Sequence, residues 1–362
     1  MLAHLLRFEY QTIHTPDKTL NPILLSYCQE DELINSAHHH GLDAFLFRMI
    51  FQHHLSRYFS PSRLSGLEKR AMCHQIQLLR NQHSLYQLLN SIPGNFCPVV
   101  LLKGSALTHI LYGDTKDRQF NDLDLLVATD RLDQMTALLH TLQYKQDPYR
   151  RSREAALQRL ISQHLPPFRR EGCTIELHTR LLPREYGSFS RHFFINSYPI
   201  TWNNVSARLP DQKYHLLFLM AHIEKHARSG LLQWRLLRDI ALLTGHHTSI
   251  WSPLYDLAAE YQLTHEIKFV QDRLFALYDW SPAAIDLHHI SIHMHRPVSG
   301  FSTIRQILNR IPDTRTKIRW LAGWIFPAPG YMRFRYPQVK GWNIYLVYLQ
   351  RWIRGFIRII HP

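Results

Sequence analysis

The sequence predicts an α+β fold, in which a small mixed β-sheet core is flanked by helical regions on its N-terminal and C-terminal sides. Apolar residues recur at helical spacing near both ends of the chain, whereas the middle holds short apolar segments separated by turn residues. The pattern changes at the turn-forming residues 91–95. We therefore expect an N-terminal helical region (1–92), a core (93–185) and a C-terminal helical region with a basic amphipathic tail (186–362).

Helices are expected in the two outer regions. In the N-terminal region, residues 31–89 carry apolar side chains at helical spacing and few turn residues. In the C-terminal region, the same spacing predicts helices over 214–226 and 231–243. Both regions therefore have the pattern of helical layers that pack against a core.

Three short strands are expected in the core. They are segments 98–102, 123–127 and 173–179, which are short, apolar and bounded by turn residues or helix starts. A helix should follow the first strand over 106–112, and another should follow the second over 130–142. The centre of the chain is therefore predicted to be mixed α/β.

Length and composition are those of a folded intracellular protein. The chain has 362 residues and 45% apolar content, which is enough for two or three packed units. None of its four cysteines forms a Cys-x-x-Cys pair, so neither a disulfide framework nor a zinc site is indicated. The N-terminus does not resemble a secretion signal, and no apolar run is long enough to cross a bilayer. We expect a cytoplasmic protein.

Asp122 and Asp124 stand at the start of the second expected strand. The two-residue period of a strand places both carboxylates on one face and Leu123 and Leu125 on the other. Two such carboxylates repel each other, and a divalent cation between them reverses that repulsion, since oxygen ligands suit Mg²⁺. The alternative is an acidic strand end in a solvated loop, and an isolated Asp-x-Asp does not decide between the two.

A possible phosphate site precedes this pair. The first expected strand runs through Lys103, Gly104 and Ser105 directly into a helix. Gly104 allows a ligand to approach the backbone, Ser105 offers a hydroxyl, and the first N–H groups of a helix attract anions. The alternative is a plain strand-to-helix turn with a capping serine.

Glu176 and His178 share one face of the third expected strand, and Ile175 and Leu177 share the other. Glu176 is a candidate for the third carboxylate of a metal site. In a two-metal mechanism, that carboxylate helps to bind the ion that activates the attacking hydroxyl. The alternative is an ion pair with a neighbouring arginine such as Arg169.

These three pieces, in this order, resemble the nucleotidyltransferase superfamily typified by DNA polymerase β. The chain is still more similar to a bacterial subfamily of largely uncharacterised nucleotidyltransferases. The residues that carry the resemblance are Lys103-Gly104, Leu111-Tyr112, Arg118, the run from Asp122 to Val127, and Glu176-Leu177-His178. The loop between Ser105 and Asp122 is longer than in compact superfamily members, and the third carboxylate is Glu rather than Asp. The metal geometry is therefore left open.

The resemblance implies an Mg²⁺-dependent transferase, with Mn²⁺ as an alternative ion and an NTP, most simply ATP, as donor. It implies that Asp122, Asp124 and Glu176 are the catalytic metal ligands. The phosphates of the nucleotide would be held by Lys103, Gly104, Ser105 and Arg118. For Arg118, a plain surface arginine is an equally open interpretation.

His222 and His226 stand four residues apart in the expected helix 214–226, with Lys225 beside them. A zinc-protease helix requires Glu directly after the first His, and this chain has Ile223 there, so that class is excluded. The group either presents a basic surface to the nucleotide pocket or packs beneath the helical layer.

The C-terminal segment carries most of the net charge of +14. From residue 305 to the end there are eleven Lys and Arg residues and one acidic residue, Asp313. From Trp342 onward the segment projects as a helix with an apolar aromatic side and a basic side. It either packs on the body of the protein or contacts an anionic partner, a membrane surface or RNA.

Three hypotheses follow. The first is an Mg²⁺-dependent nucleotidyltransferase with an unidentified acceptor. The second is a non-catalytic nucleotide-binding or scaffold protein that docks through its basic tail. The third is an RNA-directed nucleotidyltransferase or toxin. The sequence leaves open the acceptor, the base of the nucleotide and the oligomeric state.

Overall fold

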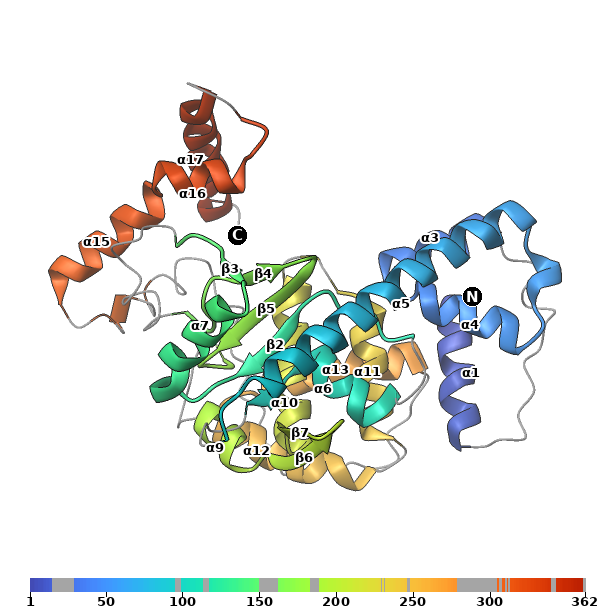
Figure 1. Ribbon diagram of the computed structural model, residues 1–362. Coiled ribbons are helices and arrows are strands. Elements are labelled where there is room, and N and C mark those ends of the chain that lie inside the picture. Colours follow the sequence, from blue (N-terminus) through green and yellow to red (C-terminus); the bar gives the residue numbers. More distant parts are fainter. Residues whose placement is uncertain are drawn as a thin grey trace.

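The structure is a computed structural model. It describes residues 1–14, 29–94, 99–112, 117–149, 162–182, 189–228, 230, 232–245, 248–278, 305, 308–309, 311, 313–339 and 343–360. Figure 1 shows a central sheet with helices on both faces and a separate group of helices from the C-terminal end of the chain. The predicted α+β class with helical flanks is confirmed.

The sheet contains seven strands in the order β3-β4-β5-β2-β1-β7-β6. Their bounds are Val100–Leu101 (β1), Leu123–Leu126 (β2), Lys145–Gln146 (β3), Phe168–Arg170 (β4), Cys173–His178 (β5), Tyr198–Trp202 (β6) and Val205–Leu209 (β7). Neighbours β2 and β5 are parallel, as are β1 and β7, and the other pairs are antiparallel. The three strands expected from the sequence correspond to β1, β2 and β5. They are consecutive at the centre of this sheet, with β2 between β5 and β1.

The sheet continues beyond residue 185, where we placed the end of the core. Strands β6 and β7 form a hairpin, and β7 pairs with β1 through Val100 and Arg208. The hairpin turns at Asn203 and Asn204, whose φ angles are 47° and 65°. Asparagine tolerates this left-handed region, which two-residue hairpin turns require. The segment assigned to the C-terminal helical region therefore contains two strands of the core sheet, which follow helix α9 (Phe189–Ile195).

Helices of the N-terminal region lead onto the sheet. They are α1 (Leu2–His14), α3 (Glu30–His39), α4 (Asp43–Gln52), the short η1 (Ser56–Tyr58) and α5 (Pro61–Asn90). Helix α5 packs against α4 and also against β5 and β7, so it runs from the N-terminal helices across the sheet (Figure 1). Its leucines Leu78, Leu85 and Leu88 join the hydrophobic cluster of the sheet.

The remaining helices of the body follow the strands. They are α6 (Lys103–Leu107), the π-helical η2 (Thr108–Tyr112), η3 (Thr129–Arg131), α7 (Leu132–Thr141), α9 (Phe189–Ile195), α10 (Gln212–Arg228), α11 (Trp234–Thr244), η5 (Thr248–Ile250), α12 (Trp251–Glu260) and α13 (Thr264–Tyr278). The helices expected over 106–112, 130–142, 214–226 and 231–243 correspond to α6 with η2, α7, α10 and α11.

The two faces of the central strands meet different layers. Leu123 and Leu125 of β2 pack in the cluster that contains α5 and α7. Leu126 of the same strand packs in the larger cluster that contains α10 to α13. Because side chains alternate along a strand, Asp124 faces the same side as Leu126. The sheet therefore presents Asp124 toward the layer of α10 and α11.

The C-terminal helices are α15 (Thr314–Ile325), α16 (Pro329–Arg335) and α17 (Ile344–Ile360). Helices α16 and α17 form a small hydrophobic cluster around Met332, Ile344 and Val347, α17 donates hydrogen bonds to backbone carbonyls of α15, and Figure 1 shows the three helices apart from the sheet. Trp342, where the predicted amphipathic helix began, lies outside the described residues. No helix in the described ranges is both long enough and apolar enough to span a membrane.

Candidate functional site

Strands β2 and β5 place two carboxylates next to each other. The strands are parallel neighbours, and their register pairs Asp124 directly with Glu176. Facing residues on one side of a sheet have adjacent side chains. Asp124 is buried and Glu176 is partly exposed. The sequence predicted that each residue lies on a strand, and the structure brings the two together.

Asp124 is held by two positively polarised groups. Nζ of Lys103 and Nε2 of His178 both donate to Oδ1 of Asp124, each at 2.8 Å. Burial by itself raises the pKa of Asp124, but the charge of Lys103 and the hydrogen bond from His178 outweigh it and hold the pKa well below its usual range. Burial lowers the pKa of Lys103, and Asp124 more than offsets this and raises it. Asp124 is therefore a carboxylate in the folded chain.

A compact group of three possible metal ligands surrounds this carboxylate. Ligand atoms of Asp124, Glu176 and His178 all lie within 4.8 Å of one another. Nε2 of His178 is 3.7 Å from Oε2 of Glu176, and Nε2 of His164 is 3.8 Å from the same oxygen. Burial opposes the charge on His178, but its hydrogen bonds to Asp124 and Glu176 raise its pKa. The sequence does not mark His178 as a site residue, although its position on the same strand face as Glu176 is a usable signal.

Asp122 lines the same cavity but is not part of this close group. Burial, and then the negative charge of Asp124, raise its pKa to about 6. The charges of Lys103 and Arg235 oppose this rise in pKa but do not cancel it. The predicted set of Asp122, Asp124 and Glu176 therefore shares one cavity, with Asp124 and Glu176 as its close pair.

The turn after β1 has a restrained backbone. Lys103 has a φ of 45°, in the left-handed region that residues other than glycine rarely adopt. Gly104 lies against Phe120, since a Cβ at position 104 would come within 2.5 Å of the Phe120 Cβ. Glycine is therefore required there by close packing.

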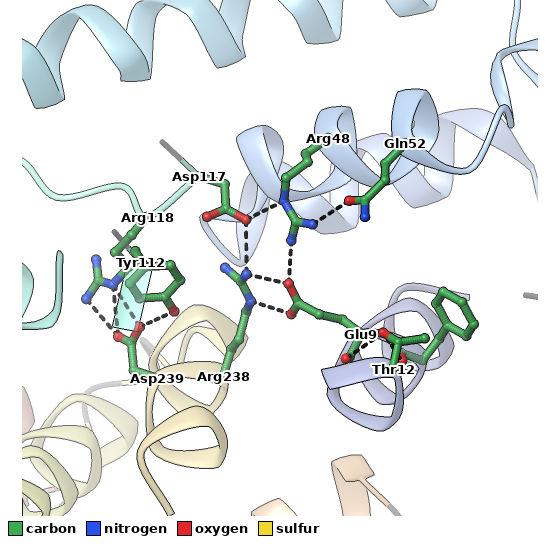
Figure 2. A network of polar contacts seen from close by, with 10 residues as sticks. Glu9, Thr12, Arg48, Gln52, Tyr112, Asp117, Arg118, Arg238 and Asp239 are labelled. Atoms are coloured by element: carbon green, nitrogen blue, oxygen red, sulfur yellow. Dashed lines mark hydrogen bonds and ion pairs between the residues drawn. The ribbon is translucent and has the colours of Figure 1, made fainter. Parts of the chain in front are cut away.

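Two of the predicted phosphate-binding side chains are hydrogen-bonded within the protein. The Ser105 hydroxyl is buried and donates to the carbonyl of Leu102 at 2.7 Å. Arg118 lines the cavity, but its guanidinium pairs with Asp239 at 2.7 Å, and Asp239 also accepts from the hydroxyl of Tyr112 (Figure 2). Lys103 and Gly104 open onto the cavity, whereas Ser105 does not line it.

The cavity has a volume of about 360 Å³, within the range of small-molecule sites. Its sheet wall carries the carboxylates. Its opposite wall is formed by α10 and α11 and carries His222, Lys225, His226 and Arg235. The basic group that we noted in the expected helix 214–226 thus faces the carboxylates across the cavity. Arg235 is not among the site residues predicted from the sequence. It is held at the cavity by a hydrogen bond to the carbonyl of Gln119, which is far away in the sequence.

A family described as uncharacterised nucleotidyltransferases matches residues 28–272, well over half of the chain. The chain belongs to this nucleotidyltransferase family. No curated protein matches it. The matched range contains β1, β2, β5, α10 and α11, and so every cavity residue named above. The suspected family membership and the assignment as a transferase enzyme are confirmed.

The donor set of this nucleotidyltransferase fits a hard divalent cation. Carboxylate oxygens are the ligands that Mg²⁺ and Mn²⁺ prefer, and a neutral imidazole is an acceptable additional ligand for Mn²⁺. The ammonium of Lys103 already provides a positive charge at Oδ1 of Asp124, and Asp122 forms no ion pair with any other described residue. Asp122, Asp124 and Glu176 would hold the ion, with His178 fixing the orientation of Asp124.

Proposed function

We propose that the protein uses a divalent cation, Mg²⁺ or Mn²⁺, to transfer a nucleoside monophosphate from an NTP, most simply ATP, to an acceptor. An acceptor oxygen forms a bond to the α-phosphorus, the bond from that phosphorus to the bridging oxygen breaks, and pyrophosphate leaves with the electron pair. The acceptor proton passes to solvent. When bound, the metal ion would neutralise the phosphates and lower the pKa of the attacking group.

One observation carries this proposal. Asp124 and Glu176 are register partners in one cavity that Asp122 also lines, in a chain that belongs to a nucleotidyltransferase family. We propose that these three carboxylates are the metal ligands. Such a group of buried or half-buried carboxylates costs free energy unless cations compensate it. The presence of all three in this chain argues against a non-catalytic scaffold.

We propose two roles for the residues at the predicted phosphate site. Some contact the nucleotide directly, and others hold the backbone around it in place. Lys103 and the backbone of Gly104 line the cavity and are proposed to contact the nucleotide directly. For Ser105 and Arg118 we had predicted direct contacts as well. Their hydrogen bonds to Leu102 and Asp239 favour a role in holding the turn and the loop before Asp122.

Labelled nucleotides test the proposal. Purified protein is incubated with each α-labelled NTP, Mg²⁺ or Mn²⁺ and cell extract, and the labelled product is identified. We expect transfer from at least one NTP and a loss of about a thousandfold or more in Asp122→Ala and Asp124→Ala, since both remove metal ligands. Absence of transfer, with nucleotide binding indifferent to both substitutions, overturns it.

For the C-terminal helices we propose contact with an anionic membrane, which would place the enzyme at the cytoplasmic face of the inner membrane. Tyr345, Leu346, Leu349 and Ile353 of α17 are all at least half exposed, and cations dominate this part of the chain. Exposed apolar side chains beside cations favour a lipid surface, because RNA backbones attract only the cations.

A vesicle-pelleting experiment tests this surface. With phosphatidylglycerol vesicles, Leu346→Glu and Leu349→Glu should weaken binding about tenfold, since each replaces an exposed apolar contact by an anion. Ile195→Glu, at an equally exposed position on α9, is the control. Binding that is unchanged by the α17 variants contradicts the membrane proposal. Salt-dependent RNA binding in place of vesicle binding favours the RNA-directed alternative.

A further inference from the structure

The helical wall of the cavity carries two cations without carboxylate partners. Arg235 lies in the first turn of α11 and Lys225 lies near the end of α10. Both line the cavity opposite Asp122, Asp124 and Glu176. We propose that Arg235, assisted by Lys225, binds a phosphate group of the substrate. This inference rests on the proposed function for the choice of ligand.

Arg235 is fixed in place entirely by uncharged groups. Its Nη1 donates to the carbonyl of Gln119, and its Nη2 donates to Oε1 of Gln233 at 2.8 Å. Its Nε is buried and has no hydrogen-bond partner among the residues that the structure describes. It makes no ion pair with any carboxylate in the described part of the chain. A buried donor of a charged group is costly unless an anion accepts from it.

The surroundings of Arg235 disfavour its charge. Burial, followed by repulsion from Arg118, lowers its pKa to about 10. Asp239, the carboxylate next to it on α11, is already occupied by Arg118 and Tyr112. Asp122 attracts Arg235 but does not form an ion pair with it. The missing partner is therefore an anion that enters the cavity.

Lys225 extends the same wall toward Glu176. Its Nζ donates to Oε1 of Gln163 at 3.0 Å, a neutral acceptor, and it makes no ion pair in the described part of the chain. The side chain is exposed where it lines the cavity, so it can follow a ligand. His222 and His226 lie on the same wall. Burial is the main reason that the pKa of each is lowered, so they are neutral hydrogen-bonding groups at pH 7.

A phosphate fits this separation of charge. The other cavity cations are already paired, Lys103 with Asp124 and Arg118 with Asp239. Within the described residues, one wall of the cavity therefore holds a carboxylate without an ion pair, Asp122, and the other wall holds two cations without carboxylate partners, Arg235 and Lys225. A metal-bound phosphate supplies the counterpart of each. The planar guanidinium of Arg235 and the ammonium of Lys225 suit an anion with several oxygens.

Binding without turnover tests the inference. Tripolyphosphate is titrated into the full chain by calorimetry with EDTA present, using wild type, Arg235→Met, Lys225→Met and Lys213→Met. Lys213 lies on α10 and is exposed away from the cavity. We expect affinity to fall about tenfold or more in the first two variants, the loss of a charge-assisted hydrogen bond, and to stay unchanged in the third. Unchanged affinity in both Arg235→Met and Lys225→Met overturns the inference.

Two additions make each outcome decisive. If Arg235→Met fails to fold, Arg235→Gln is used in its place, because it keeps a donor for the Gln119 carbonyl while removing the charge. The affinity of Arg235→Gln for tripolyphosphate is then compared with that of wild type. Competition distinguishes the source of the phosphate. If a non-hydrolysable ATP analogue with Mg²⁺ displaces inorganic phosphate, Arg235 and Lys225 bind a phosphate of the nucleotide donor. If the analogue and inorganic phosphate bind at the same time, the two residues bind a phosphate of the acceptor. Phosphate binding without any nucleotidyl transfer would refute the proposed function alone.

Discussion

Lys103 shows how one residue can serve both the fold and the site. Its backbone lies in the left-handed region, and its ammonium forms the ion pair with Asp124 at 2.8 Å. Strain of this kind persists only where surrounding interactions enforce it, and it is common at functional sites. The ammonium compensates a fully buried carboxylate. Lys103 therefore holds positive charge where the proposed metal ion would add more.

Removing that charge should destabilise the metal-free protein. In Lys103→Met, Asp124 keeps only His178 as a partner, and we expect a loss of about 3 kcal/mol in the free energy of unfolding. Mg²⁺ should then raise the melting temperature of the variant more than that of wild type. Lys268→Met, which breaks an exposed pair with Asp272, is the control and should cost under about 1 kcal/mol. Equal Mg²⁺ responses in variant and wild type would argue against an ion at Asp124.

His215 predicts a pH dependence of stability outside the site. It is fully buried in α10, neither ring nitrogen has a hydrogen-bond partner in the described ranges of the chain, and burial lowers its pKa to about 3 from an ordinary 6.5. The unfolded chain binds a proton below pH 6.5 and the folded chain does not until about pH 3. The free energy of unfolding therefore falls as pH decreases through this window, by up to about 1.4 kcal/mol per pH unit.

Urea unfolding of His215→Leu at pH 7.5 and pH 5 measures this contribution. Wild type should lose about 2 kcal/mol more than the variant between these two pH values. His83→Leu, at an exposed position on α5, should follow wild type. Parallel pH profiles of wild type and His215→Leu would show that the buried imidazole has a hydrogen-bond partner.

The residues of the site were predictable in unequal measure. Asp122, Asp124 and Glu176 are marked by strand periodicity and by order along the chain. No sequence pattern marks Arg235 as a site residue. Its proposed role depends on having only uncharged hydrogen-bond acceptors in the described structure, and only the folded chain brings those acceptors together. The hydrogen bond of Ser105 to Leu102 is similarly invisible in sequence, since a serine after glycine suits both a phosphate and a backbone carbonyl.

At the scale of elements, short strands were recognised where they are apolar and buried, as in β1, β2 and β5. The hairpin β6–β7 was missed because its residues are largely exposed on one strand, which weakens the apolar signal. Its Asn203-Asn204 turn was nevertheless a usable signal. Strands β3 and β4 have only two and three residues, and segments that short carry no periodicity.

Close packing of α6 against the loop before β2 makes a prediction for Gly104. Gly104→Ala places a Cβ within 2.5 Å of the Phe120 Cβ, an atom that cannot move away without its backbone. We expect a loss of about 1–3 kcal/mol in the free energy of unfolding. Gly66→Ala in α5 is the matched control, because nothing lies within 4 Å of its added Cβ and alanine favours a helix, so stability should rise slightly. A neutral Gly104→Ala would contradict the close approach.

At the scale of the whole molecule, a buried ionic network joins four segments that are far apart in the sequence (Figure 2). Arg238 of α11 pairs with Glu9 of α1 at 2.6 Å and with Asp117 at 3.0 Å, and Arg48 of α4 pairs with both acids. Asp117 lies five residues before Asp122, and Arg118 beside it binds Asp239. The network therefore ties the N-terminal helices to the loop that carries the carboxylates. No local pattern predicts it, because its members are up to 229 residues apart.

Glu9 is the member of this network that lies outside the range matched by the family, so its removal tests whether α1 belongs to the same cooperative unit. Glu9→Gln leaves the buried Arg238 short of one carboxylate, and we expect a loss of about 3–5 kcal/mol in the free energy of unfolding. The double variant Glu9→Gln with Arg238→Met should recover part of this loss, since no charge is then left unpaired. Asp31→Asn, which breaks an exposed pair with Arg63 at 2.7 Å, should cost under about 1 kcal/mol.

If Glu9→Gln is as mild as Asp31→Asn, α1 folds independently of the catalytic core. If it is as severe as expected, urea unfolding followed by far-UV circular dichroism should show a single transition at lower urea, because α1, α4, α11 and the Asp117 loop lose their common anchor together.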